Sequence, residues 1–418
     1  MEQLIVKTAV IGGGASGLSA AIVCGRRYGG GSTIILEKQR KTGRKLLATG
    51  NGRCNITNSR VSPEHYHGDR RIIASVLSGF DADNMKSFML SLGVLLREES
   101  EGRIYPYSNQ ASTILDAMRN ECERLGVREL CEVDISSVKQ VKGGYVISAG
   151  ELTVRAENVI FATGSQASPM LGADGSGYSL LEAMGLSHKP LFPALSPVFT
   201  KKPDKSLKGI RAKGSVTLLS DGKRLSQTEG EIQFTENGIS GICVFELSRA
   251  INEFFALGTA DGRRCSSLDI TADLMSGLSF TELCDHLNMC RKLYGNMKAT
   301  ELLSGALNRR ISAAAAVKCG FADKQCSEVT GQEIKKLAGC IKAFGFTPVK
   351  HDAFKSAQVS AGGFGSDVVD HRTLMVKKYR GMYICGELLD VDGDCGGYNL
   401  HFAVGSAMLA AASINDFR

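Results

Sequence analysis

The chain has 418 residues, of which 48 are glycine, 8 are proline and 43% are apolar. This apolar content excludes an intrinsically disordered chain, and the few prolines, with no three-residue glycine period, exclude a collagen-like one. The net charge of +7 is spread along the chain, which favours an ordinary solvated surface over a nucleic acid-binding one.

The 13 cysteines contain no C-x-x-C spacing, which argues against zinc ribbons, iron–sulfur clusters and thioredoxin-like redox pairs. We therefore expect no metal site, and free thiols fit a reducing cytoplasm. The sequence has no run of eighteen apolar residues, and its first ten residues do not have the pattern of a signal peptide. We expect a cytoplasmic protein with no membrane partner.

The first motif is a strand, a glycine turn and a helix. Residues 7–11 form a β-type run, and a G-x-G-x-x-G pattern follows before a helical stretch at 18–24. Glycine at these places gives a tight turn, lets the backbone approach a pyrophosphate, and packs helix on strand. The candidate phosphate ligands, bound by N–H groups at the positive end of the helix, are Gly12, Gly14, Ala15, Ser16 and Gly17.

A second strand, residues 33–37, ends in Glu37, twenty positions after Gly17. A carboxylate at this place accepts hydrogen bonds from both hydroxyls of a ribose. It also repels a 2′-phosphate, which disfavours NADP at this first site. Together, the two strands and the glycine motif predict a dinucleotide site.

Residues 42–58 form a polar segment, interrupted by glycines, that is too irregular for a crossover helix throughout. Its backbone groups need partners. Arg44, Lys45 and Arg53 carry charges suited to a pyrophosphate, whereas Asn51 and Asn55 carry amides suited to an isoalloxazine edge. By composition alone, an irregular surface loop with Asn-Gly turns is an equally good interpretation.

Two long motifs carry a family resemblance: GRKLLATGNGRCNITN at 43–58 and GELLDVDGDCGGYN at 386–399. They closely resemble a bacterial family of FAD-binding oxidoreductases described as BaiN-type or aminoacetone-oxidase-like, and the likeness runs from end to end. The resemblance implies an α/β fold with a glutathione-reductase-like Rossmann domain that binds FAD, interrupted by an inserted β-barrel and helical domain. We expect the FAD-binding domain at 1–190 and 347–418, the barrel at 191–275 and the helices at 276–346.

The resemblance extends the candidate cofactor site beyond the first glycine motif and Glu37. Glu387 stands where related flavoproteins have an Asp that binds a ribityl hydroxyl, so its longer stem is a departure. The helix after Asn399 is implied to point its N-terminal N–H groups at the flavin edge where negative charge settles on reduction. The implied cofactor contacts are Lys38, Arg44, Lys45, Asn51, Gly52, Arg53, Cys54, Asn55, Val133, Thr163, Gly164, Gly386, Glu387, Asp394, Gly396, Gly397, Tyr398 and Asn399.

The inserted segment begins at a domain crossing, because four of the eight prolines lie between 190 and 203. A hairpin signal at Asp221 and Gly222 and an alternating run at 230–235 predict strands. Capping boxes that begin at Ser279 and at Thr330 predict helices. We expect this insertion to carry loops that set substrate specificity.

No side-chain nucleophile is required, since a flavin carries hydride chemistry itself. His401, one turn into the last helix, is a candidate proton-transfer residue, and Cys54 and Cys395 are candidate redox thiols. A plain helical histidine and small packing cysteines are the structural alternatives. His65 and His67 form an H-x-H pattern, but nothing nearby in the sequence completes a metal site.

We expect an FAD-dependent oxidoreductase that transfers a hydride between flavin N5 and a small organic substrate. The leading hypothesis is reduction of an enone, such as a 3-oxo-Δ4 bile acid or steroid, with NAD(P)H as candidate donor. No second complete G-x-G-x-x-G domain is present for that donor.

Three alternatives remain open: oxygen-dependent oxidation of an amine such as aminoacetone, tRNA modification, and a non-redox FAD-binding scaffold. The absence of Trp and of a clustered basic face argues against a nucleic acid partner. The sequence does not define the oligomeric state.

Overall fold

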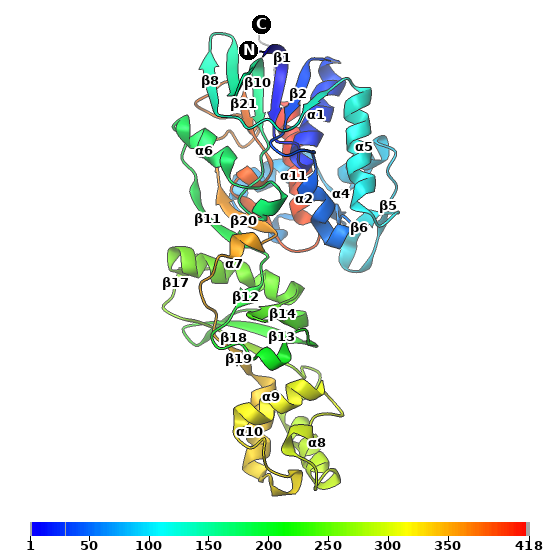
Figure 1. The fold of residues 1–418 in the computed structure, drawn as a ribbon, viewed down its shortest axis with the longest axis vertical. Helices are drawn as coiled ribbons and strands as arrows, with labels where there is room; N and C mark the ends of the chain where they lie inside the picture. Colours follow the sequence, from blue (N-terminus) through cyan, green and yellow to red (C-terminus); the bar gives the residue numbers. More distant parts are fainter. Residues whose placement is uncertain (1, 30, 415–418) are drawn as a thin grey trace. The chain divides into compact units, whose positions relative to one another are not determined.

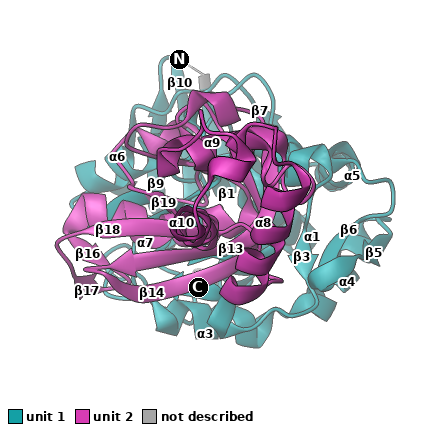
Figure 2. Ribbon diagram, turned by 90° about the horizontal axis from the view of Figure 1, so that it is seen from below, with its two compact units in different colours: residues 1–192, 357–418 teal, residues 193–356 magenta. Residues whose placement is uncertain are grey.

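The computed structural model describes residues 2–29 and 31–414. The chain divides into two compact units, which are coloured separately in Figure 2. Unit 1 consists of Met1–Phe192 and Ala357–Arg418, and unit 2 consists of Pro193–Ser356. The insertion therefore ends about ten residues later than the expected boundary at 346.

Unit 1 is built on a seven-stranded sheet of order β7-β2-β1-β10-β9-β8, with β21 also paired to β10 (Figure 1). Strands β7, β2, β1, β10 and β21 run parallel to one another, whereas β9 is antiparallel to β10 and β8 is antiparallel to β9. Helix α1 crosses over from β1 to β2, as a Rossmann arrangement requires. The strand bounds are β1 Glu2–Ile11, β2 Thr33–Leu36, β7 Arg128–Leu130, β8 Ser137–Val141, β9 Gly144–Ala149, β10 Leu152–Phe161 and β21 Met382–Ile384.

The central strands are apolar on both faces. The 9–11, 34–36 and 159–161 stretches are all buried, as is usual for the central strands of a parallel sheet. Helices α1 and α11 pack against each other although one begins and the other ends the chain. The helices of unit 1 are α1 Ala15–Tyr28, α2 Arg44–Ala48, α3 Arg70–Gly79, α4 Ala82–Ser91, α5 Ala111–Arg124, α6 Ser176–Ala183 and α11 Tyr398–Ala412.

Three small sheets complete unit 1. One of them, β4 with β22, joins residues more than 320 positions apart and places His67 opposite Asp392 and Tyr66 opposite Gly393. The strands of these sheets are β3 Thr57–Asn58, β5 Leu96–Glu98 and β6 Arg103–Pro106; β4 Tyr66–Gly68 and β22 Val391–Gly393; and β11 Lys189–Ala194 and β20 Val359–Gly363.

Unit 2 holds a six-stranded sheet of order β12-β15-β14-β13-β18-β19. Its two ends meet, because Lys201 N–H donates to the Thr347 carbonyl (2.8 Å) and Val349 N–H donates to the Phe199 carbonyl (2.9 Å). The sheet therefore closes into a small barrel and leaves no open edge there. These bonds also explain why the insertion extends past 346. The strands are β12 Val198–Phe199, β13 Arg211–Ser220, β14 Lys223–Phe234, β15 Gly238–Ser240, β18 Leu268–Asp273 and β19 Phe344–Phe346, with a separate pair, β16 Thr259–Ala260 and β17 Arg263–Arg264.

The helices of unit 2 pack around a hydrophobic core of their own. The two predicted capping boxes are present: Ser279 caps α8 with Glu282, and Thr330 caps α10 with Glu333. The helix bounds are α7 Ile242–Leu257, α8 Phe280–Leu293, α9 Arg309–Cys319 and α10 Gly331–Lys342.

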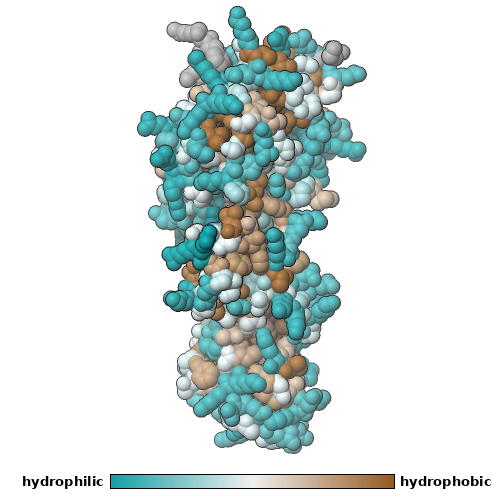
Figure 3. Space-filling model, turned by 90° about the vertical axis from the view of Figure 1, so that its left-hand side faces the viewer, coloured by the Kyte–Doolittle hydropathy of each residue, from teal (hydrophilic) through white to brown (hydrophobic). Residues whose placement is uncertain are grey.

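Hydrophilic side chains protrude over much of the face shown in Figure 3. Within the part of the chain that the structure describes, no helix is both long enough and apolar enough to span a bilayer.

Candidate cofactor site

The N-terminus of α1 is a candidate anion site. A Cβ on Gly17 would lie 1.9 Å from the Gly12 carbonyl oxygen, so only glycine allows the loop to fold back on the helix. At Gly14, the N-cap, a Cβ would meet nothing within 4 Å, and no side chain caps the helix. In the described residues, the Ala15 and Ser16 N–H groups have no acceptor. Free N–H groups at a helix N-terminus suit a phosphate.

Glu37 holds this loop from the end of β2. Its Oε2 accepts from Gly13 N–H and its Oε1 accepts from Gln39 N–H, both at 2.7 Å. Each carboxylate oxygen retains a lone pair for a ribose hydroxyl. Val133 N–H donates to the Glu37 carbonyl (2.9 Å), which places Val133 beside the same turn. The Lys38 ammonium pairs instead with Asp174 (2.9 Å) and Asp134 (3.3 Å).

The three cations expected at a pyrophosphate are engaged within the protein. Lys45 Nζ lies 2.7 Å from Glu387 Oε2, and Arg53 lies 2.6 Å from a Glu99 carboxylate oxygen. Arg44 donates to the Gln39 amide oxygen and to a backbone carbonyl. In this arrangement, the positive potential for a phosphate comes from the helix end.

The Glu387 carboxylate also forms hydrogen bonds within the protein. Besides Lys45, its carboxylate accepts from Ser165 Oγ (3.0 Å) and Ser360 N–H (3.2 Å). Ser165 directly follows Thr163 and Gly164, which leave the end of β10. These bonds join three segments of unit 1 at Glu387, and the expected ribityl contact of its carboxylate stays a prediction.

Gly386 links the two long helices. Its N–H donates to Ser406 Oγ on α11 (2.9 Å), and a Cβ on Gly386 would lie 2.7 Å from Ser16 Oγ on α1. The first and last motifs of the chain therefore meet at the start of α1.

The N-terminus of α11 is the second uncapped helix end of the site. Its N-cap, Gly397, has φ 98°, and a Cβ there would lie 2.5 Å from the Thr57 carbonyl oxygen and 2.8 Å from Asn55 Oδ1. Asn55 Oδ1 is buried without a hydrogen-bond partner in the described residues. An orphaned buried acceptor costs about 1–3 kcal/mol, so a ligand N–H such as an isoalloxazine imide fits this place.

The remaining polar residues of the two motifs differ in exposure and role. Asn51 and Gly52 are exposed, with Asn51 in the left-handed region at φ 55°. The Asn399 side chain bonds both backbone groups of Gly393, at 2.8 and 2.7 Å, and so fixes the turn before α11. A Cβ on Gly396 would lie 3.2 Å from the Tyr398 ring.

The surroundings of two of the three candidate catalytic side chains fit the structural alternative better than a catalytic role. His401 is fully buried, and both ring nitrogens are engaged: Nδ1 lies 2.7 Å from Thr57 Oγ1 and Nε2 lies 3.0 Å from the Phe80 carbonyl oxygen. Burial lowers the pKa of His401 to about 4. Burial also raises the pKa of the Cys54 thiol to about 12, so Cys54 is an inert packing residue. Cys395 is half-buried.

A cluster missed by the sequence analysis lies beside α11. Asp394 Oδ2 lies 3.1 Å from His65 Nδ1, and Asp394 Oδ1 lies 3.0 Å from His67 Nε2. Burial would raise the pKa of Asp394, but the hydrogen bonds from His67 and His65 outweigh it and hold that pKa below its ordinary value. The H-x-H pattern was visible in the sequence, but its carboxylate partner is supplied by β4–β22 pairing. In the described ranges, no group of three such side chains is arranged to hold a metal.

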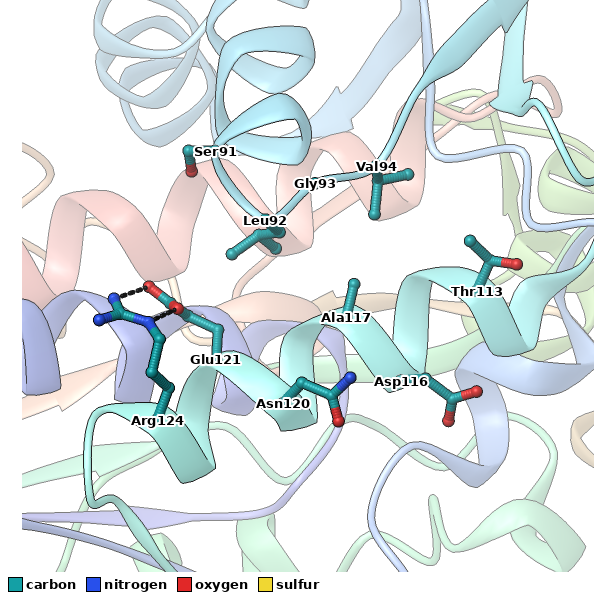
Figure 4. A pocket seen from close by; sticks show the side chains of 10 residues that line it. All are labelled: Ser91, Leu92, Gly93, Val94, Thr113, Asp116, Ala117, Asn120, Glu121 and Arg124. Atoms are coloured by element: carbon teal, nitrogen blue, oxygen red, sulfur yellow. Dashed lines mark hydrogen bonds and ion pairs between the residues drawn. The ribbon is translucent and has the colours of Figure 1, made fainter.

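A separate surface hollow of about 450 Å³ lies where the end of α4 faces α5 (Figure 4). It contains the Arg124–Glu121 ion pair (2.6 Å). None of the predicted site residues lines this hollow, which is therefore no part of the candidate cofactor site.

Known proteins resemble this chain over nearly its full length. The family model described as HI0933-like protein Rossmann domain matches residues 6–413. A 3-dehydro-bile acid delta(4,6)-reductase of Clostridium scindens is 35% identical over 96% of this chain and 97% of the relative. Ribosomal RNA dihydrouridine synthases of Haemophilus influenzae and Escherichia coli are 27% and 25% identical, over 97% of this chain and 98% and 97% of the relatives.

Solved structures with similar folds are more distant. A 3-ketosteroid-delta4-(5alpha)-dehydrogenase from Rhodococcus jostii aligns with a TM-score of 0.46 and 16% identity, over 98% of this chain and 96% of that one. A flavocytochrome c3 fumarate reductase aligns with a TM-score of 0.47 and 14% identity, over 98% and 78% of the two chains. The family match alone spans most of the sequence, and the chain belongs to the HI0933-like protein family, with a Rossmann-type FAD-binding domain in unit 1.

Proposed function

We propose that this FAD-dependent oxidoreductase reduces a carbon–carbon double bond conjugated to a carbonyl group, with a nicotinamide as electron donor. One observation carries the substrate class: relatives that align over nearly the whole chain are named for reactions on the same functional group. A 3-dehydro bile acid with Δ4,6 bonds is an extended enone. The 5,6 double bond of uracil, which is saturated in dihydrouridine, is conjugated to a ring carbonyl.

FAD fits the residues of unit 1. The N–H groups at the start of α1 would bind the pyrophosphate, Glu37 would bind the ribose, and Asn55 with the start of α11 would bind the isoalloxazine edge. Bound FAD supplies a hydride to the substrate carbon β to the carbonyl. The partial positive charge at the α11 N-terminus favours the negative charge that reduction brings to that edge.

The leading substrate is a small enone such as a 3-oxo-Δ4 bile acid or steroid, because the reductase relative is 35% identical and covers 97% of its own length. Amine oxidation by oxygen is the competing chemistry for the same cofactor.

A uracil base in RNA is a second candidate, favoured by the charge of unit 2. Unit 2 has 23 Lys and Arg against 17 Asp and Glu, a net charge of +6, whereas unit 1 has 27 against 26, a net charge of +1. The segment 201–213 alone carries six exposed Lys and Arg and one Asp. In the described residues, only Lys208 and Arg211 of those six form ion pairs, with Glu236 and Glu231. Unpaired lysines suit RNA phosphates.

The test is an anaerobic experiment in two stages. The protein is first mixed with NADH or NADPH, and bleaching of the flavin is expected with at least one of them. The reduced protein is then mixed with a 3-oxo-Δ4 steroid or with a ribosomal RNA fragment, and reoxidation by one of them identifies the substrate class. If only oxygen restores the flavin colour, and an amine reduces it, the amine-oxidase alternative replaces the reductase. An RNA substrate also requires binding that weakens steeply with salt.

A further inference from the structure

Reduction of a conjugated double bond needs a proton as well as a hydride. When the hydride adds to the β-carbon, the π electrons move to the α-carbon, and a proton must reach that carbon to complete the product. A positioned side chain that delivers it accelerates such a step by roughly 100- to 10,000-fold. The following inference rests on the proposed function and concerns the source of this proton.

His65 and His67, hereafter the histidine pair, are bridged by Asp394. This cluster lies close to the α11 N-terminus. Asp394 is three residues before the N-cap, Gly397, which places their Cα atoms within about 11 Å. The His65 ring stacks on the Tyr398 ring, the first residue of α11, with centroids 4.3 Å apart and planes 16° apart. This stacking and the carboxylate bond together fix the plane of the His65 imidazole.

Asp394 also determines which ring nitrogens are available. An ionised carboxylate only accepts hydrogen bonds, so His65 donates from Nδ1 and His67 donates from Nε2. His65 Nε2 and His67 Nδ1 remain without a protein partner in the described residues. The side chains of His65 and His67 are 33% and 34% exposed, so these nitrogens are accessible to a ligand.

Asp394 provides one negative charge for two imidazoles. One carboxylate compensates one positive charge, so His65 and His67 together with Asp394 are neutral when one imidazole is protonated and carry a net charge of +1 when both are. The charged groups around this cluster include Glu64 and Arg70 beside His65, and Arg60, Glu101 and Arg103 beside the Tyr398 phenol.

Three other ionisable groups near α11 do not offer an accessible proton. His401 has both ring nitrogens engaged, and Cys54 is buried. The Tyr66 hydroxyl is buried and donates to the Tyr398 carbonyl (3.0 Å). His65 is accessible and carries a ring fixed in orientation.

We propose that His65 is the catalytic acid that donates its Nε2 proton to the α-carbon of the substrate, with Asp394 and His67 as positioning residues. The α-carbon gains the proton, the imidazolium becomes a neutral imidazole, and the two electrons of the new β-carbon–hydrogen bond come from the reduced flavin. The nicotinamide donor supplies those electrons in turn. Solvent reprotonates the histidine pair, and Asp394 stays ionised throughout.

The test compares His65→Gln, Asp394→Asn and His67→Gln with a matched control, His371→Gln. His371 also lies in unit 1, and its Nδ1 lies 2.8 Å from a hydroxyl, Ser75 Oγ, with no carboxylate partner. Each holoenzyme is reduced anaerobically by the nicotinamide and then reoxidised by the conjugated substrate. Flavin reduction is expected to be unchanged in all four variants. Reoxidation is expected to slow at least about 100-fold in His65→Gln, and less in the two positioning variants.

The pH profile separates an acid from a structural residue. In the wild-type protein, reoxidation is expected to slow as pH rises and the histidine pair loses its proton, and this dependence is expected to disappear in His65→Gln. A second readout does not depend on turnover. In protein with ¹⁵N-labelled histidine rings, the His65 Nδ1–H and His67 Nε2–H groups are expected to be hydrogen-bonded in the wild-type protein, and at least one of them is expected to lose its bond in Asp394→Asn.

The outcomes distinguish this proposal from the function on which it rests. If His65→Gln is reoxidised within about threefold of the wild-type rate, with the same pH profile, the acid is another group and the assignment is overturned. If the wild-type protein is reduced by no nicotinamide or is reoxidised by no conjugated substrate, the proposed function fails first and the acid assignment falls with it.

Discussion

Helices α1 and α11 of unit 1 begin at Gly14 and Gly397, neither of which supplies a side-chain cap. Helices α8, α9 and α10 of unit 2 begin at Ser279, Asn308 and Thr330, and each of these side chains accepts from the first turn of its helix. A missing cap leaves N–H groups unsatisfied unless a ligand binds them. An uncapped start does not mark a site by itself, because α7 of unit 2 also begins at a glycine, Gly241, without a side-chain cap. The starts of α1 and α11 differ from that of α7 because they lie among the residues of the candidate cofactor site.

The two units also differ in charge. Unit 1 is nearly neutral and unit 2 carries most of the net positive charge, with 23 basic against 17 acidic residues. If the helix ends of unit 1 bind an anionic ligand as proposed, a large excess of lysine is not needed there. Substitutions in the two units are therefore expected to affect flavin binding and stability differently.

Gly17→Ala is expected to remove FAD and to destabilise unit 1 by roughly 3–5 kcal/mol, because its Cβ would lie 1.9 Å from the Gly12 carbonyl oxygen. Urea unfolding and flavin absorbance of the purified variant measure the two effects. The matched control is Gly339→Ala inside α10, where a Cβ meets nothing within 4 Å. In that control, the free energy of unfolding is expected to rise by up to about 1 kcal/mol, and the flavin is expected to stay bound. Equal losses in both variants would contradict the comparison.

Stability is expected to fall by about 3 kcal/mol between pH 6.5 and pH 4 through His401 alone. Burial lowers the pKa of His401 to about 4 in the folded protein, whereas the unfolded histidine keeps a pKa near 6.5. In this window, the unfolded state binds more protons, so the contribution is complete above pH 6.5 and lost as pH falls toward 4.

The free energy of unfolding measured against pH checks this contribution. His401→Gln is expected to be less stable at pH 7 but to show a correspondingly flatter dependence of the free energy of unfolding on pH. A wild-type slope in His401→Gln would show that another group is responsible.

Gly14→Ala is expected to weaken FAD binding at least tenfold, about 1.4 kcal/mol, while the free energy of unfolding of the apoprotein hardly changes. The added Cβ meets no protein atom within 4 Å, so it would occupy the space through which a phosphate approaches the helix. FAD titration of the apoprotein gives the affinity. An unchanged affinity would mean that the open space at Gly14 is not the phosphate site.

Ser279→Ala and Thr330→Ala are each expected to cost about 1 kcal/mol of stability in unit 2, because each removes a helix cap. Flavin content is expected to be unaffected. Thermal unfolding followed with flavin absorbance measures both. Loss of flavin in either variant would show that unit 2 helps to hold the cofactor.

The sequence predicted those parts of the fold that depend on interactions between residues close together in the chain. The strand–glycine–helix start, the strand ending in Glu37 and the caps at Ser279 and Thr330 each depend on residues a few positions apart. The barrel closure depends on long-range pairing, and the sequence offered no local signal that the segment at 347–349 still bonds to the segment at 199–201.

The residues of the candidate site stay predictions, and their contacts within the protein were not predicted from the sequence. Lys45 was matched to a phosphate by its charge, but it meets Glu387, 342 positions away. The partner of His65 and His67 is Asp394, which reaches them only because β4 pairs with β22. His401 was placed correctly on its helix, yet Thr57 and Phe80, which surround its ring, come from other segments. Side-chain partners set by tertiary packing cannot be found from spacing in a single sequence.

We propose that unit 1 binds FAD between two uncapped helix ends and uses it to reduce a conjugated double bond. The most direct measurement is the anaerobic spectrum of the purified full-length protein as a nicotinamide and then a 3-oxo-Δ4 steroid or uracil-containing RNA are added in turn. We expect one FAD per chain, whose absorbance is bleached by the nicotinamide and restored by one of the two substrates. A colourless protein that takes up no FAD, or a flavin that no nicotinamide reduces, would contradict it.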